Sequence, residues 1–241
     1  GTDIGKYSFG WIGPAGKFSL APDYGTGEEK WAFIPANLVP RLKNNLLGSE
    51  DRAYVDASPA VADVYIDVDD DNDKEWRTVI LSAEGNGGDS IFCLDVTDTS
   101  NLPKFLWEYS ASGLFRSRYS PAIASIGRIY DINEEGSKWV AFFVSGRNYE
   151  DSFPAIYMLD IDSGELLDKI LLDAIDVGKG GTPSGQPAII DSDGNGFIDR
   201  AYIGTDKGYL YKINLPDNPS AAGTMSSILV NADFTDESGN T

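Results

Sequence analysis

The chain has 241 residues, of which 41% are hydrophobic and 12% aromatic, a composition typical of a globular protein long enough for one large domain. Its formal net charge of −19 disfavours nucleic acids and anionic membranes as direct partners, because both would repel it. Histidine is absent, which removes the usual general base and transition-metal ligand, and no apolar run is long enough for direct membrane insertion.

The N-terminal part of the chain gives few clear elements. The chain begins with Gly and carries no signal peptide, so we expect a mature or excised piece. Residues 1–27 are rich in glycine and aromatics and receive no assignment. Residues 29–35 (EKWAFIP) are typical of a strand, and we interpret them as the last inner strand of an incomplete blade. Residues 36–47 follow Pro35 with apolar residues at helical spacing, which predicts one short helix.

The rest of the chain repeats one pattern of strand, turn, strand, glycine-rich turn and strand. Pro59, Pro121 and Pro187 open the three units at intervals of 62 and 66 positions. A fourth strand is predicted at 105–109 in the first unit and 166–172 in the second, and a further strand at 226–234. Each unit has three core strands. They are predicted at 58–61, 78–81 and 91–96 in the first unit, at 120–123, 139–143 and 156–161 in the second, and at 186–189, 200–204 and 209–214 in the third.

Repeats of short strands in register predict an all-β fold, a β-propeller of about three to four blades with roughly four antiparallel strands each. The alternative is a β-sandwich with chance similarity between its strands. We expect residues 1–241 to form one propeller region, with a partial blade and a helical connection over 1–50 and blades over 51–112, 113–180 and 181–241. Because propellers usually close with four to eight blades, we expect a companion chain or further blades to complete the ring.

Residues 191–199 (DSDGNGFID) carry the strongest chemical pattern in the chain. The EF-hand calcium loop takes oxygen ligands from positions one, three, five, seven and nine and has glycine at position six, and this segment matches each of them. Short β-branched or aromatic runs flank it, so we place the loop at the tip of a β-hairpin. The predicted ligands of Ca²⁺ are the side chains of Asp191, Asp193, Asn195 and Asp199 and the main-chain carbonyl of Phe197.

The loop departs from the EF-hand at position twelve, where Tyr202 replaces the bidentate glutamate. Asp199 is therefore expected to bind the ion directly as the closing carboxylate. The alternative is an ordinary acidic turn, since Asp, Asn and Gly are common turn residues.

A second acidic stretch, residues 67–75, occupies the equivalent hairpin position of the first unit. Its alternating carboxylates can gather a second Ca²⁺, with Asp67, Asp69, Asp71 and Asp73 as candidate ligands. No glycine is present to make the turn, and runs of like charge are usually solvated loops. We therefore favour a solvated hairpin, with the metal site as the alternative.

Nothing in the chain gathers the residues of a recognisable active site. Cys93, the single cysteine, lies in an apolar run and is expected to be a buried small hydrophobe. Asp95 and Asp160 recur at equivalent places in two units, which indicates a structural turn-capping role. The five tryptophans make a quinone-dependent dehydrogenase propeller a less favoured alternative, because no stretch combines a stacking tryptophan, a carboxylate base and cofactor-binding arginines. We predict that the protein is not an enzyme.

Four segments in order resemble the PilY/PilC family, proteins of the type IV pilus tip and outer membrane: residues 33–35 (FIP), 54–59 (YVDASP), 94–98 (LDVTD) and the 191–199 loop. The resemblance covers about residues 28 to 240. It implies a C-terminal β-propeller, a calcium site on the EF-hand-like loop with the ligands named above, and roles in pilus biogenesis, calcium-dependent extension and retraction, and surface adhesion.

The resemblance also implies an extracellular location at the pilus tip or outer membrane surface. The expected partners are pilin subunits or other pilus-tip proteins and a host or abiotic surface. The alternative function is a purely structural propeller scaffold of an extracellular filament or surface complex.

Overall fold

The computed structural model divides into two compact units, residues 1–34 and residues 35–241. Within the described residues, no helix combines the length and the apolar character needed to cross a membrane. The described residues are 11–12, 18–19, 30–43, 47, 54–69, 71, 73–111, 114, 124–130, 137–145, 155–171, 183, 185–206 and 208–215.

The N-terminal unit contains one small antiparallel ribbon, in which β1 (Trp11–Ile12) pairs with β2 (Phe18–Ser19). The strand predicted at 29–35 is wrong over its described part, because residues 30–35 are irregular. Pro35 lacks the N–H that a strand ladder needs, and it serves instead as the N-cap of the helix that follows.

The predicted short helix begins where expected but is a 3-10 helix, η2 (Ala36–Arg41), followed by two helical residues. Pro40 lies inside it, and in an α-helix its ring would clash with the carbonyl of the residue four positions earlier, which favours the tighter winding. The N–H of Leu38 donates to the Pro35 carbonyl at 3.1 Å, and the Leu38 side chain is buried. Residues 44–46 of the predicted helix lie outside the described residues.

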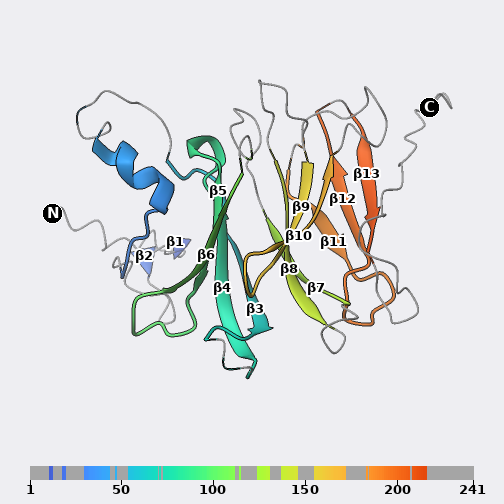
Figure 1. Cartoon of the computed structure of the whole chain (residues 1–241), viewed down its shortest axis with the longest axis horizontal. Coiled ribbons are helices and arrows are strands. Elements are labelled where there is room, and N and C mark those ends of the chain that lie inside the picture. Colours follow the sequence, from blue (N-terminus) through green and yellow to red (C-terminus); the bar gives the residue numbers. More distant parts are fainter. Residues whose placement is uncertain are drawn as a thin grey trace. The chain divides into compact units, whose positions relative to one another are not determined.

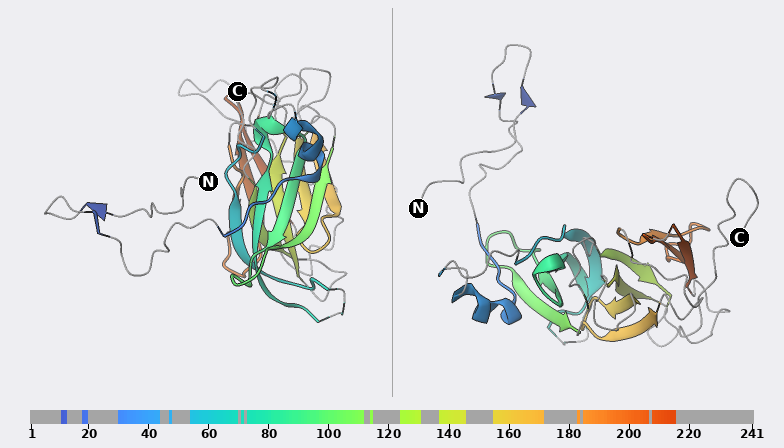
Figure 2. Two further views of the ribbon diagram at one scale, coloured as in Figure 1. Left: turned by 90° about the vertical axis from the view of Figure 1, so that its left-hand side faces the viewer. Right: turned by 90° about the horizontal axis from the view of Figure 1, so that it is seen from above.

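Three antiparallel sheets follow in chain order, and they stand side by side (Figures 1 and 2). Their strands pair in sequence order, and in the two four-stranded sheets the fourth strand is the outer one, as in propeller blades. The fold is therefore all-β and propeller-like, and the sheets of the described residues do not close into a ring, as the repeats predicted. The strands are β3 (Ala60–Ile66), β4 (Glu75–Ala83), β5 (Ser90–Asp95) and β6 (Lys104–Ser110); β7 (Ser125–Ile129), β8 (Lys138–Val144), β9 (Ala155–Asp160) and β10 (Leu166–Leu171); and β11 (Ala188–Ile190), β12 (Arg200–Gly204) and β13 (Leu210–Asn214).

Two predicted strands fall on parts of the chain that the structure leaves undescribed. These are the lead-in at 120–123 and the strand at 226–234. The residue boundaries predicted for the blades likewise stay a prediction.

The innermost strands of successive sheets are neighbours, since β7 contacts both β3 and β11.

The middle sheet is buried on both faces, which explains its nearly continuous apolar strands. One face, including Phe143, Tyr157 and Leu159, packs on the first sheet. The opposite face, including Phe142 and Met158, packs on the hydrophobic residues of the third sheet and its connection. Because neighbouring residues of a strand point to opposite faces, a strand covered on both sides must be apolar at every position.

A tryptophan joins the outer strand of the first sheet to the turn between β9 and β10. The indole N–H of Trp107 donates to the carbonyl of Ile161 at 2.7 Å. Gly164 lies against the same indole with φ +73°, and a Cβ there would stand 2.6 Å from the ring. The turn therefore needs a residue without a side chain both for its backbone angle and for this contact.

Asp95 and Asp160 cap the turns that end β5 and β9, which confirms their predicted structural role. Asp95 Oδ1 accepts the N–H of Thr97 at 2.9 Å, and Asp160 Oδ1 accepts the N–H of Asp162 at 2.9 Å. In these two sheets a basic residue of the second strand also reaches the carboxylate: Lys138 Nζ lies 3.0 Å from Asp160 Oδ2, and Arg77 Nη1 lies 3.7 Å from Asp95 Oδ2. Equivalent blades thus repeat one capping device at the same place.

Candidate metal centre

The 191–199 loop lies at the tip of a β-hairpin, as its flanking strands predicted. β11 and β12 pair antiparallel on either side of it, with Ile190 opposite Arg200. The N–H of Asp199 donates to the carbonyl of Ile190 at 2.9 Å and closes the base of the loop. The loop is therefore held by a regular ladder and is not flanked by helices.

Asp191, at position one, organises the turn through backbone N–H groups. Its carboxylate accepts the N–H of Gly194 at 2.7 Å, of Asn195 at 3.2 Å and of Gly196 at 2.7 Å. The N–H of Gly196, followed by those of Gly194 and Asn195, holds the pKa of Asp191 below its ordinary value despite some desolvation. Asp191 is therefore a carboxylate at neutral pH, which is the form that binds a cation.

Gly196, at position six, supplies the sharp turn that the pattern requires. Its φ is +89°, in the region that favours glycine. The two residues that flank Gly196 are hydrogen-bonded to each other: the N–H of Phe197 donates to Oδ1 of Asn195 at 2.8 Å. Asp193 and Asn195 are also linked, with the Asn195 N–H donating to Asp193 Oδ1 at 3.1 Å. Positions three, five and seven are thus joined in one curled segment.

Asp199, at position nine, is buried and bonded to Ser192. The Ser192 N–H donates to Asp199 Oδ1 at 3.0 Å, and the Ser192 hydroxyl donates to Asp199 Oδ2. A carboxylate has about four acceptor positions, so Asp199 retains capacity for a further partner. Tyr202, at position twelve, lies in β12 and brings no carboxylate to the loop.

The donor set fits calcium, which prefers carboxylate, amide and carbonyl oxygens. Within the part of the chain that the structure describes, however, the trio of carboxylates gathered within 4.8 Å is Asp67, Asp69 and Asp71. The carboxylates of Asp191, Asp193 and Asp199 are each turned to N–H or O–H donors of their own. A Ca²⁺ ion in this loop would draw them together and offset their mutual repulsion.

Two residues of the neighbouring blade, missed by sequence reasoning, pack on the loop. Arg128 of β7 donates from Nε to the Gly196 carbonyl at 3.1 Å, and its Cζ lies 4.6 Å from the centroid of the Phe197 ring. Tyr130 meets the same ring edge-on, with centroids 5.9 Å apart. No local pattern reveals these contacts, because they join residues 67 to 69 positions apart in different blades.

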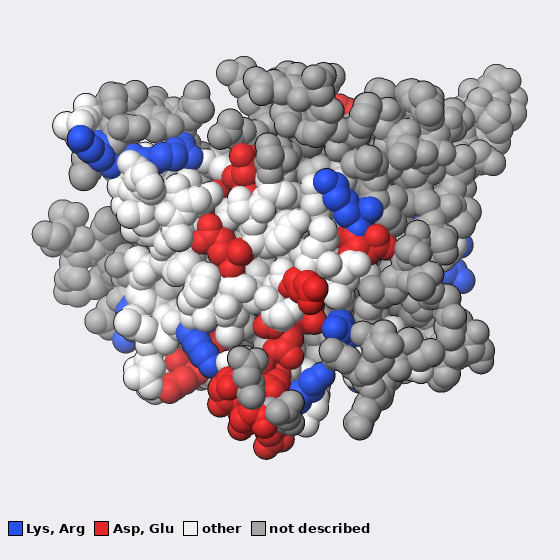
Figure 3. Space-filling model, viewed as in Figure 1, with Lys and Arg blue, Asp and Glu red and all other residues white. Residues whose placement is uncertain are grey.

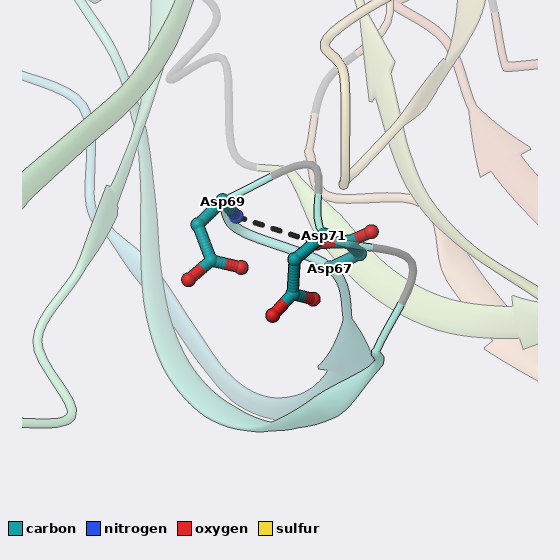
Figure 4. Close-up of side chains that lie close together, drawn as sticks. All are labelled: Asp67, Asp69 and Asp71. Carbon is teal, nitrogen blue, oxygen red and sulfur yellow. Dashed lines mark hydrogen bonds between the residues drawn. The ribbon is translucent and has the colours of Figure 1, made fainter.

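The second acidic stretch forms the turn between β3 and β4, where acidic side chains gather on the surface (Figures 3 and 4). Asp67, Asp69 and Asp71 bring carboxylate oxygens within 4.8 Å of one another, and the N–H of Asp69 donates to Asp67 Oδ1 at 3.3 Å. Asp73, the fourth candidate, is not part of this trio, and its N–H caps Asp71 Oδ1 at 2.8 Å. Both interpretations of the stretch, solvated loop and second metal site, stay predictions.

Asp162 of the second blade adds a further carboxylate beside this turn and accepts the N–H of Asp67 at 3.3 Å. Burial is the largest cause that raises the pKa of Asp162, to about 6. The hydrogen bond from the Asp67 N–H lowers this pKa by less, and the charge of Asp160 raises it further. The folded state therefore holds this proton more tightly than the unfolded state. The resulting contribution to stability is full below pH 3.8, the ordinary value, and is lost as the pH rises through 6.

We expect Asp162→Asn to be more stable than the parent protein at pH 8, because the amide keeps the acceptor and carries no charge. After allowance for solvent screening, the expected gain is about 1 kcal/mol. The gain should shrink as the pH falls towards 4, and urea denaturation at several pH values measures it. Asp98→Asn is the control, and it should lower the stability at pH 8 instead of raising it. The reason is that Asn101 and the Ser100 N–H hold the pKa of Asp98 below its ordinary value, so the folded state favours the charged form. A gain that is equal at pH 8 and pH 4 would contradict the assignment.

Cys93 is fully buried in β5 and is a free thiol. Burial, and secondarily the charge of Asp95, raises the pKa of this thiol far above its ordinary range. A thiol without accessible thiolate is a poor nucleophile. The residue therefore serves as part of the core between the first two sheets.

Residues 28–232 match the family of the PilY1 beta-propeller domain. The chain belongs to this family. The resemblance to PilY/PilC proteins noted from the sequence is thereby confirmed. The crystal structure of the Pseudomonas aeruginosa PilY1 C-terminal domain superposes with a TM-score of 0.62 and 25% identity, over 84% of this chain and 40% of that one.

Curated PilY1 relatives are much longer than this chain. The type IV pilus biogenesis factor PilY1 of Pseudomonas aeruginosa strain PAO1 is 29% identical over 195 residues, which is 78% of this chain and 15% of that protein. A PilY1 homolog of Xylella fastidiosa is 29% identical over 202 residues, 78% of this chain and 13% of the homolog. These relatives are named as biogenesis factors and not as enzymes, while the absence of catalysis in this chain stays a prediction.

Proposed function

We propose that this chain is a calcium-binding part of a PilY1 propeller that acts in type IV pilus biogenesis. The observation that carries the proposal is the 191–199 hairpin tip. There Asp191 is held as a carboxylate by three backbone N–H groups, and Gly196 turns the chain at position six. The ligands would be the side chains of Asp191, Asp193, Asn195 and Asp199 and the carbonyl of Phe197.

Calcium would neutralise three carboxylates on one short loop and order the tip of the hairpin. An ordered tip is a surface that a partner can recognise, so occupancy can control partner binding. Family membership supports pilin subunits or other pilus-tip proteins as those partners, at the pilus tip or the outer membrane surface. Control of extension and retraction, and adhesion to a host or abiotic surface, are the roles we propose for the complete protein.

A purely structural role for the ion is the second candidate. It is favoured by the contacts of the loop with the neighbouring blade through Arg128 and Tyr130. Affinity separates the two roles, because a switch needs a Kd near the surrounding free calcium concentration, whereas a permanently bound ion needs a much lower Kd.

Calcium titration calorimetry tests the proposal directly. We expect the parent protein to bind one Ca²⁺ in this loop, and Asp191→Ala to lose binding by at least about a hundredfold, since it removes a charged ligand. Circular dichroism should show that the variant keeps its strands, because the backbone ladder between β11 and β12 does not depend on the Asp191 side chain. Asp206→Ala, beyond β12, is the matched control and should bind as the parent does. Native affinity in Asp191→Ala would refute the site.

A further inference from the structure

Arg128 of β7 forms hydrogen bonds to two consecutive peptide groups of the 191–199 loop. Its Nε donates to the carbonyl of Gly196 at 3.1 Å, and its own carbonyl accepts the N–H of Ile198 at 2.8 Å. These contacts lie on either side of Phe197, the residue whose carbonyl is the proposed ligand at position seven. Arg128 of the second blade therefore contacts the peptide groups on both sides of Phe197, a proposed ligand residue of the third blade.

The two contacts determine where the Phe197 carbonyl points. In a trans peptide the C=O and the N–H point in opposite directions, and no cis peptide occurs among the described residues. The Ile198 N–H points to β7, so the Phe197 carbonyl of the same peptide group points away from β7. In the preceding peptide the Gly196 carbonyl points to Arg128, while the Phe197 N–H points to Asn195 in the loop.

The Arg128 side chain is matched in shape to this segment. The guanidinium lies over the Phe197 ring, with Cζ 4.6 Å from its centroid. A Cβ at position 196 would stand 2.5 Å from Nη2 of Arg128, so a residue larger than glycine there would displace the guanidinium. The same strand also packs tightly nearby, because a Cβ at Gly127 would stand 2.8 Å from Cδ1 of Ile198.

We propose that Arg128 is a positioning residue for the calcium loop. By fixing the peptide groups on both sides of Phe197, it presents the Phe197 carbonyl to the ion, and ion binding in turn tightens the contact between the second and third blades. This inference rests on the proposed calcium function. The positive charge of Arg128 acts in the opposite sense, since it repels a cation, so variants that separate charge from hydrogen bonding are informative.

Three variants make that separation. Arg128→Met keeps the apolar stem as far as the position of Nε and loses both the donor and the charge, while Arg128→Gln loses the charge and keeps an N–H donor at about that position. Arg200→Met is the matched control: the Nε of Arg200 lies 3.9 Å from Asp199 Oδ2, so this change removes a positive charge beside the loop without breaking a bond to its backbone.

We expect Arg128→Met to raise the calcium Kd roughly tenfold, the change that follows from losing about one hydrogen bond from a charged group. Arg128→Gln should stay within about threefold of the parent, and Arg200→Met should bind as tightly or more tightly. Hydrogen exchange gives a second readout. Calcium should slow exchange of the Ile198 amide in the parent protein and slow it less in Arg128→Met.

The outcomes separate the positioning role of Arg128 from the proposed calcium binding of the loop. If the parent binds calcium, Asp191→Ala does not, and Arg128→Met binds as the parent does, the positioning role is wrong and the calcium site stands. If Arg128→Gln is as weak as Arg128→Met, the donor bond is not what positions the loop. If the parent does not bind calcium, both the function and the inference fail. Equal melting temperatures of the calcium-free proteins exclude a folding defect as the cause of weak binding.

Discussion

Phe143→Ala is expected to lower the free energy of unfolding by about 3–5 kcal/mol, the range for deleting a buried aromatic side chain. Phe143 is fully buried in β8 and stacks on Tyr157, with ring centroids 5.2 Å apart and an interplanar angle of 3°. It belongs to the core that joins the first two sheets, together with Leu81 and Cys93 of the first. The alanine variant leaves a cavity between two blades, where the sheets cannot easily collapse.

Urea denaturation followed by tryptophan fluorescence measures this effect. Phe105→Ala is the matched control, because Phe105 lies in the outer strand β6 and is 49% exposed. It should cost about 1 kcal/mol or less. Equal losses in the two variants would mean that contact between the blades does not stabilise the fold.

Calcium is expected to raise the stability of the parent protein by about 3 kcal/mol when its free concentration is a hundred times the Kd. The gain arises because the folded loop gathers the ligands and the unfolded chain does not. A chelator should remove the gain, and the melting temperature by differential scanning calorimetry measures it. At a thousand times the Kd the expected gain is about 4 kcal/mol.

Asp191→Ala should melt at the same temperature with calcium and with chelator. Magnesium is a second control, since it demands a near-octahedral set of ligands at shorter distances and should stabilise the parent less than calcium does. A parent protein whose melting is indifferent to calcium would leave the loop as an acidic turn.

The sequence determined the order of strands and the position of the loop, because both depend on local patterns. Proline-led repeats and short runs of β-branched, aromatic and other apolar residues located β4, β5, β8, β9, β12 and β13, because such runs are typical of strands. The spacing of Asp191, Gly196 and Asp199 located the hairpin tip, because turn geometry is a property of neighbouring residues. The same local logic failed at residues 30–35, where a strand-like composition has no partner to pair with among the described residues.

Only the tertiary structure decided which distant groups meet. It brought Asp162 of the second blade to the acidic turn of the first, and placed Arg128 over the loop of the third. Pairs of residues 62 to 95 positions apart, such as Ser125 with Pro187 and Asp67 with Asp162, leave no periodic trace in the chain. The ligands of the proposed site could therefore be predicted from spacing, whereas the residue that positions them follows from how one blade packs on the next.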